Sequence, residues 1–79
     1  MFTGKHFRLK AATLGIESVG EQRTAIMIPA GAVIEVLSGP RPDDKRMVDV
    51  LWEDRKLVVF AEDIIKRGEE VQATSGGSD

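Results

Sequence analysis

The amino-acid sequence predicts an all-β fold: a small barrel of five or six strongly bent antiparallel strands, with one short helical turn near the C-terminus. Short β-branched runs alternate with compact turn signals between residues 28 and 71. A segment with helical character then precedes a last short strand. We expect residues 1–72 to form one domain and residues 73–79 a disordered tail, because that tail has no apolar residue larger than alanine.

Length and composition limit what the chain can be. Its 79 residues leave room for a single core, and it has no cysteine for disulfides or thiolate metal sites. No apolar run approaches the roughly 20 residues of a membrane-spanning helix, and no signal peptide is evident. We therefore expect a cytoplasmic protein with no membrane partner. A net charge of −2 argues mildly against nucleic-acid binding.

The first strand is expected from Phe7, with Phe7, Leu9 and Ala11 on one face. Leu14 and Ile16 then continue the alternation on the opposite parity. A one-residue slip in a period of two predicts a bulge or a sharp bend, which the first strand of a small closed barrel often needs.

Turn signals delimit the next elements. Residues 19–22 predict a turn around Gly20, which is free to adopt a positive φ. A strand over residues 23–28 follows and ends at the turn signal Pro29-Ala30-Gly31. Further strands are expected over residues 32–38 and 46–53. The residues expected on the core faces of these three strands are Ile26, Ile28, Ile34, Val36, Val48, Val50 and Trp52.

The remaining segments are a loop, a hairpin and the helical turn. Two prolines and a glycine predict a loop over residues 39–45, and residues 53–56 predict a polar hairpin turn before a return strand over 57–60. In the segment from Ala61 to Arg67, acidic residues precede basic ones, which suits the helix dipole. Gly68 is a natural C-terminal cap, and residues 69–72 predict a last edge strand.

The segments I-P-A-G-A-V-I-E-V-L-S-G and V-D-V-L-W-E-D-R-K-L-V-V-F-A-E-D-I resemble small bacterial SH3-like barrel domains. In those domains a proline–x–glycine turn and a β-run precede a tryptophan-bearing strand, a tight turn and a short helical turn. The resemblance covers roughly residues 26–71. It implies an SH3-like barrel but no single function, because this fold serves peptide binders, cell-wall binders, RNA-associated modules and enzyme subunits. The chain has no tyrosine, so a groove for proline-rich peptides is not expected.

One enzyme family of this fold, the type II dihydrofolate reductases, forms a homotetramer around a single pore and uses NADPH. Its pore signature is V-Q-I-Y. The best-matching segment here, residues 58–61, reads V-V-F-A and agrees only at Val58. A pore-type reductase therefore stays a remote alternative, and we expect neither a cofactor nor an enzymatic activity.

No constellation of residues predicts a catalytic or metal site. His6 is the only histidine, and the adjacent carboxylates Asp43 and Asp44 are flanked by basic residues. Asp49 and Glu53, four residues apart on one strand, would be separated by roughly 13 Å, too far for a catalytic pair. The favoured function is instead a binding or assembly module that acts through protein–protein contacts.

Several large apolar residues are expected to face outward, opposite the core faces, and such surface usually marks an interface. The partner would be a second copy of the chain, in a homo-oligomer, or another protein. Trp52 could be a stacking platform or a core aromatic, and the core position is the favoured one. The residues predicted to make the contact are Trp52, Met27, Leu37, Leu51 and Phe60.

Nucleic-acid binding is the second hypothesis. Arg8 and Lys10 would point to the same side of a strand, and Arg23 and Arg46 could extend the basic surface. The acidic balance and the scarcity of aromatic residues oppose it. Such binding would weaken steeply with rising salt concentration.

Overall fold

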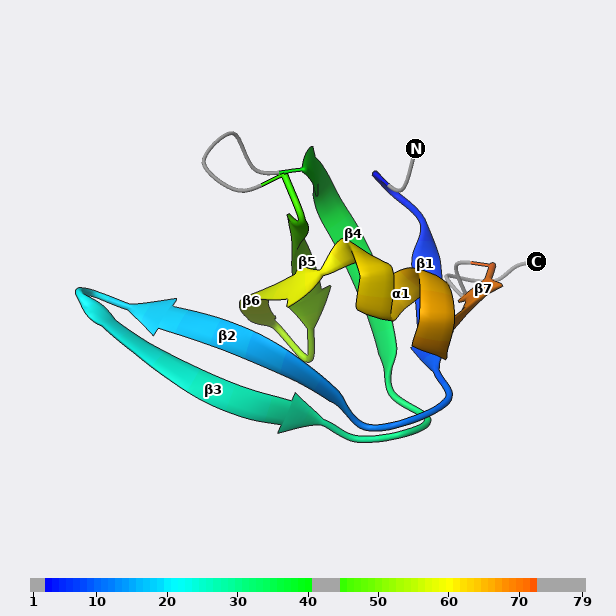
Figure 1. Cartoon of the computed structure of the whole chain (residues 1–79), viewed down its shortest axis with the longest axis horizontal. Coiled ribbons are helices and arrows are strands. Elements are labelled where there is room, and N and C mark those ends of the chain that lie inside the picture. Colours follow the sequence, from blue (N-terminus) through cyan, green and yellow to red (C-terminus); the bar gives the residue numbers. More distant parts are fainter. Residues whose placement is uncertain (1–2, 41–44, 73–79) are drawn as a thin grey trace.

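The computed structural model describes residues 3–40 and 45–72. All of its strand pairs are antiparallel, and they form one sheet in the order β3-β2-β6-β5-β4-β1-β7 (Figure 1). The all-β class and the short helix near the C-terminus are thus confirmed. The elements in chain order are β1 (His6–Leu9), β2 (Thr13–Val19), β3 (Gln22–Ile28), β4 (Val33–Pro40), β5 (Met47–Trp52), β6 (Arg55–Phe60), α1 (Ala61–Arg67) and β7 (Gly68–Val71).

The predicted first strand is two strands, because the chain turns a corner between Leu9 and Thr13. The backbone N–H of Lys10 donates to the carbonyl of Arg67 at 2.6 Å. The Arg67 guanidinium donates in turn to the carbonyl of Ala12 at 2.9 Å, so the end of α1 holds the corner in place. β1 then pairs with β4 and β7, whereas β2 pairs with β3 and β6.

The corner also sets which side of β2 faces the core. Thr13 and Gly15 are buried on the core side, so Leu14 and Ile16 point outward, and Leu14 is 38% exposed. A Cβ on Gly15 would lie 3.2 Å from Ile28 Cδ1. The absence of a side chain at Gly15 therefore leaves room for the core residues of neighbouring strands.

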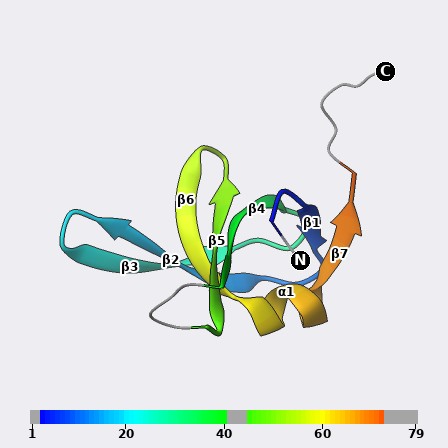
Figure 2. The same ribbon diagram turned by 90° about the horizontal axis from the view of Figure 1, so that it is seen from above.

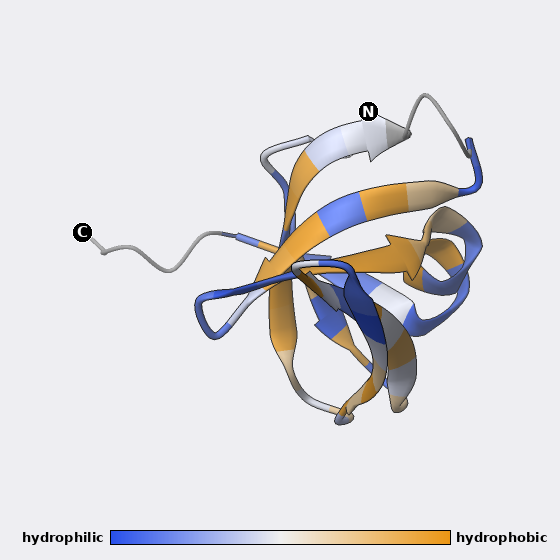
Figure 3. Ribbon diagram, turned by 90° about the vertical axis from the view of Figure 1, so that its left-hand side faces the viewer, coloured by the Kyte–Doolittle hydropathy of each residue, from blue (hydrophilic) through white to orange (hydrophobic). Residues whose placement is uncertain are grey.

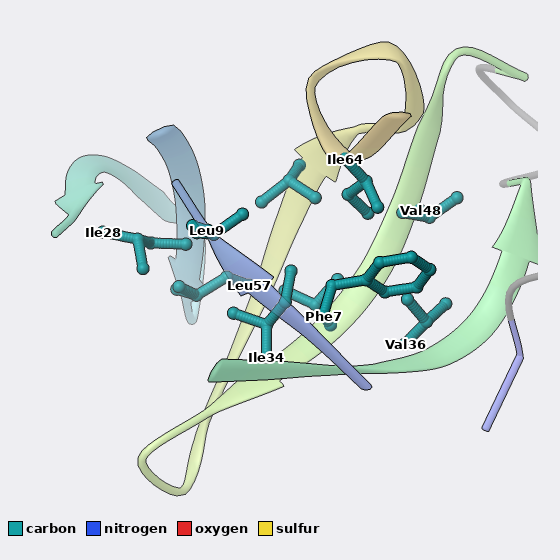
Figure 4. Close-up of a cluster of buried hydrophobic side chains, with 10 residues drawn as sticks. Phe7, Leu9, Ile28, Ile34, Val36, Val48, Leu57 and Ile64 are labelled. Carbon is teal, nitrogen blue, oxygen red and sulfur yellow. The ribbon is translucent and has the colours of Figure 1, made fainter. Parts of the chain in front are cut away.

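The core lies on the inner side of the bent sheet, and α1 closes it with the buried Ile64 (Figure 4). The predicted core faces of the strands over residues 23–28, 32–38 and 46–53 are confirmed. Ile26, Ala32, Trp52 and Ala61 are only partly buried and pack against this cluster. The buried apolar residues are Phe7, Leu9, Ile28, Ile34, Val36, Val48, Val50, Leu57, Val59 and Ile64.

Tight turns connect the strands where the sequence predicts them. Gly20 and Gly31 have positive φ angles of 61° and 89°. In the β5–β6 hairpin, Glu53 and Asp54 also take positive φ angles, of 51° and 65°. Two successive left-handed residues make a primed turn, whose twist matches that of the flanking strands.

The helix α1 has the predicted bounds, with Glu62 and Asp63 in its first turn and Lys66 and Arg67 in its last. Gly68 caps the helix as expected, but it does not adopt the left-handed conformation that is common at this position. Gly68 is extended, with φ −99° and ψ 151°, and its N–H donates to the carbonyl of Ile64. The backbone therefore passes directly from α1 into β7.

The β2–β3 hairpin reaches away from the rest of the sheet (Figures 1 and 2). β2 is paired with β6 only at Ile16–Val58 and Glu17–Leu57. β3 has β2 as its neighbour on one side, and no strand within residues 3–40 and 45–72 pairs with its other side. The predicted tail at 73–79 and the pair Asp43–Asp44 lie outside the described residues.

A candidate contact surface on the outer face of the sheet

One row of outward side chains crosses five strands. Ala25 on β3 pairs with Ile16 on β2, which pairs with Val58 on β6. Val58 pairs with Asp49 on β5, and Asp49 pairs with Ser38 on β4. Directly opposed residues share a face of the sheet, so this row begins apolar at the hairpin and ends polar at β4.

A second apolar row runs beside the first. Leu14 pairs with Met27, and Met47 pairs with Phe60. The antiparallel register of β2 with β6 places Phe60 nearest to Leu14, two residues beyond the Ile16–Val58 pair. The two rows together form what we call the outward apolar face. Its residues are Leu14, Ile16, Ala25, Met27, Met47, Val58 and Phe60.

This face is open to solvent mainly along the hairpin. Met27 is 58% exposed and Leu14 38% exposed, whereas Ile16, Val58 and Phe60 are half-buried. Figure 3, coloured by hydropathy, shows that hydrophobic and hydrophilic residues alternate in short stretches along the strands. Because exposed apolar residues lie beside one another on neighbouring strands here, the face has the character of an interaction surface.

Polar residues border the outward apolar face. The next row toward the hairpin tip holds Arg23 opposite Ser18, and Lys56 opposite Leu51. At the β4 end, the Ser38 hydroxyl donates to Asp49 Oδ2 at 2.9 Å. An apolar centre with a polar rim is the usual composition of a protein interface.

The predicted contact residues are not all in one place. Met27 and Phe60 belong to the outward apolar face, and Leu51 lies half-buried in the bordering row, opposite Lys56 and Glu35. Leu37 is half-buried where the β4–β5 register shifts. Trp52 shares the inner side with Val48 and Val50 and packs against the core.

Sequence reasoning did not assign Leu14, Ile16, Met47 and Val58 to the contact surface. The signal for Leu14 was present, because a hairpin turn at residues 20 and 21 puts it opposite Met27. Whether Val58 lies beside Ile16 on this face depends on which strand neighbours β6. That neighbour is β2, from a distant part of the sequence.

On the inner side of the hairpin, an ion pair ties β2 to the start of β6. Arg55 Nη2 lies 2.8 Å from Glu17 Oε1, and Arg55 Nε donates to Glu17 Oε2 at 3.2 Å. These hydrogen bonds from Arg55 hold the pKa of the Glu17 carboxyl below its ordinary value and raise the pKa of Arg55. This two-point contact restrains the hairpin where its backbone pairing with β6 ends.

At the opposite edge of the sheet, bases near the N-terminus face acids on β7. Arg8 Nη1 lies 3.9 Å from Glu69 Oε1, and Lys5 Nζ lies 3.7 Å from Glu70 Oε1. His6 Nε2 lies 3.9 Å from Glu35 Oε1. Carboxylates of both neighbouring strands, β4 and β7, therefore lie beside the basic side chains at the start of the chain.

The residues predicted for nucleic-acid binding come from separate parts of the fold. Arg8 is on β1 and faces Glu69, Lys10 is at the corner after β1, and Arg23 is on the hairpin strand β3. Arg46 precedes β5, and its carbonyl accepts a hydrogen bond from the N–H of Ala61. Their arrangement gives the nucleic-acid hypothesis no continuous basic strand or helix.

A shallow, open hollow between the start of β1 and β7 is lined by Gly4, Lys5, His6, Glu70, Val71 and Gln72. Within residues 3–40 and 45–72, no group of three or more His, Asp or Glu side chains could hold a metal ion. In the same part of the chain, no helix has the length and apolar character needed to cross a bilayer.

Comparison with known proteins finds no match to a family model, to a curated protein or to a solved structure.

Proposed function

We propose that the chain is a small cytoplasmic binding or assembly module with an SH3-like barrel, and that it works without catalysis, through protein–protein contacts. The observation that carries this proposal is the outward apolar face, in which Met27 and Leu14 stay exposed at the end of the described sheet where β3 is the edge strand. The core of the domain lies on the inner side of the sheet and does not cover this second apolar side. A partner surface that covered it would remove apolar area from water, which is the main favourable term in association.

The proposal is tested by changing the face without disturbing the core. Met27→Lys places a charge on a residue that is 58% exposed, so the fold should survive. The control is Val19→Lys, because Val19 is 67% exposed but lies on the other side of the hairpin. We expect Met27→Lys to lower the solution mass measured by light scattering during size-exclusion chromatography, and Val19→Lys to leave it unchanged.

The unmodified chain should be measured over a concentration series from about 10 μM to about 1 mM, a range that brackets weak association. A monomer at every concentration would contradict self-assembly. An oligomer whose mass is equally insensitive to Met27→Lys and Val19→Lys would place the contact elsewhere on the molecule.

A further inference from the structure

We propose that two copies of the chain pair along β3, antiparallel and around a two-fold axis at Ala25, so that their sheets become one continuous sheet. This inference rests on the proposed function, because it names the partner and the geometry of the self-contact. It commits to a second copy of the chain as the occupant of the β3 edge.

The β3 edge lacks the features that normally prevent strand pairing. Proteins protect edge strands with proline, short length, bulges or charges. β3 is seven residues long, contains no proline, and pairs with β2 in unbroken register from Gln22–Val19 to Ile28–Thr13. Its one charged residue is Arg23, near the hairpin tip. The edge can therefore accept a further strand along its whole length.

The other terminal strand, β7, does not suit self-pairing. It is four residues long and carries Glu69 and Glu70 at its centre. A symmetric antiparallel pairing centred on either residue would put that glutamate opposite its own copy, and like charges directly opposite one another are destabilising. Of the two sheet edges, β3 is therefore the better suited to a second copy.

Symmetry selects the register on β3. Directly opposed residues must face the same side of the sheet, so a two-fold axis has to pass through a residue paired with itself. An axis at Ala25 is the one choice that pairs all seven residues of β3. Gln22 then lies opposite Ile28 of the other copy, and Ala25 lies opposite its own copy. It puts the smallest side chain of β3 at the centre. It also sets Arg23 opposite Met27 of the other copy, whose apolar side chain can pack along the arginine stem.

Edge pairing joins the outward apolar faces of two copies, because Ala25 and Met27 belong to both the edge and that face. Standard stable interfaces bury about 800 Å² per partner. The chain exposes 5201 Å² in total, so an interface of that size would need about a sixth of its surface. One strand edge supplies less than this, and the dimer is therefore expected to be weak and concentration-dependent.

The register is tested with a single introduced cysteine, which is clean because the chain has no native cysteine. In Ala25→Cys the two thiols meet across the axis, at the Cα separation of about 4.5–5.5 Å that opposed strands impose and that a disulfide accepts. We expect mild oxidation to convert this variant largely to a covalent dimer. Val19→Cys, exposed but outside the paired strand, should stay mostly monomeric.

A charge exchange tests the same register without a covalent bond. Met27→Lys sets a lysine opposite Arg23 of the other copy, twice around the axis, and should weaken the dimer by about tenfold or more. Adding Arg23→Glu to Met27→Lys makes both pairs attractive and should restore the dimer. Within one chain these residues are four apart on a strand, roughly 13 Å, so they cannot pair locally.

The outcomes separate this inference from the proposed function. A dimer that Met27→Lys dissociates, that Arg23→Glu does not rescue and that Ala25→Cys does not trap would refute edge pairing but leave the apolar face as the contact. Equal disulfide formation in Ala25→Cys and Val19→Cys would also refute the register. A chain that is monomeric up to about 1 mM would refute edge pairing and self-assembly, and would leave the outward apolar face as a contact for a different protein.

Discussion

Gly68 is needed because a side chain at this position would clash with its neighbours, not because its backbone conformation requires glycine. Its φ and ψ angles are ordinary for any amino acid. A Cβ built there would nevertheless lie 2.6 Å from the Ile64 carbonyl oxygen and 3.4 Å from Phe7 Cβ. The first of these is a backbone atom, which cannot turn away as a flexible side chain could. Glycine thus lets the chain leave α1 and enter β7 without a gap.

Gly68→Ala should therefore destabilise the protein by about 1–3 kcal/mol, the usual cost of forcing extra volume into a packed site. Gly39→Ala is the matched control, because among the described residues a Cβ at Gly39 would come no closer than 3.9 Å to another atom, the Thr3 hydroxyl oxygen. We expect the control to change the free energy of unfolding by less than about 0.5 kcal/mol. Urea denaturation measures both, and equal effects would mean that the Ile64 carbonyl moves freely.

Trp52 lies on the core side of β5 rather than on the outward apolar face. Its parity with Val48 and Val50 predicts a core-facing position, and the structure places it against the core, partly buried. The Trp52 side chain therefore packs on the inner side of the sheet, against the core. Met27 and Phe60, which lie on the outer side, contribute to the outward apolar face instead.

At the scale of elements, the β2–β3 hairpin depends on a side-chain contact because its backbone is only briefly paired with β6. The Glu17–Arg55 ion pair acts at that point, and it lowers the pKa of Glu17 through hydrogen bonds from the guanidinium. A carboxyl whose pKa is lower in the folded state stabilises that state fully above its unfolded value of 4.5. The contribution is lost as the pH falls through the folded pKa.

The stability difference between the parent chain and Arg55→Met should accordingly be present at pH 7 and shrink as the pH falls below 4.5. The effect should be small, because Arg55 is exposed and Glu17 is only partly buried, so water screens the pair. Thermal unfolding followed by circular dichroism measures it. Lys56→Met is the control, since no ion pair of Lys56 is found within the described residues. A difference that stays constant from pH 7 to acid would contradict the assigned role of Glu17.

The helix α1 and the corner after β1 form a second coupled element. α1 buries Ile64 and leaves Ile65 66% exposed, so only one side of this short helix is used for packing. Its last residue, Arg67, holds the corner through both its carbonyl and its guanidinium. The corner is what allows β1 and β2 to join different parts of the same sheet.

At the scale of the whole molecule, the proposed dimer links stability to concentration. A partner that binds only the folded chain raises its apparent stability by mass action. The melting temperature of the parent chain should therefore rise over a hundredfold increase in protein concentration, whereas that of Met27→Lys should stay nearly constant. Differential scanning calorimetry at several concentrations checks this. Identical concentration dependence in the two proteins would count against dimerisation through β3.

The parts of the fold that the sequence predicts are those set by local interactions. The bounds of α1 follow from charges three and four residues apart, and Gly20 and Gly31 mark turns that need a positive φ. Strand parity likewise predicts the core positions of Ile34 and Val48. Each of these depends on a few neighbouring residues, so one sequence is enough to recognise them.

Only the tertiary structure decided how these elements combine. The sequence shows that Leu14 continues the alternation on the opposite parity after a bend, but only the structure shows that the corner at residues 10–12 leaves it outward beside Met27. Whether Val58 lies on the same face depends on β6 pairing with β2, some forty positions away in the sequence. By itself, the sequence determined an all-β domain with its turns, helix and most core positions. The outward apolar face and the open β3 edge are properties of strand neighbours, and such long-range pairing leaves no periodic trace in the chain.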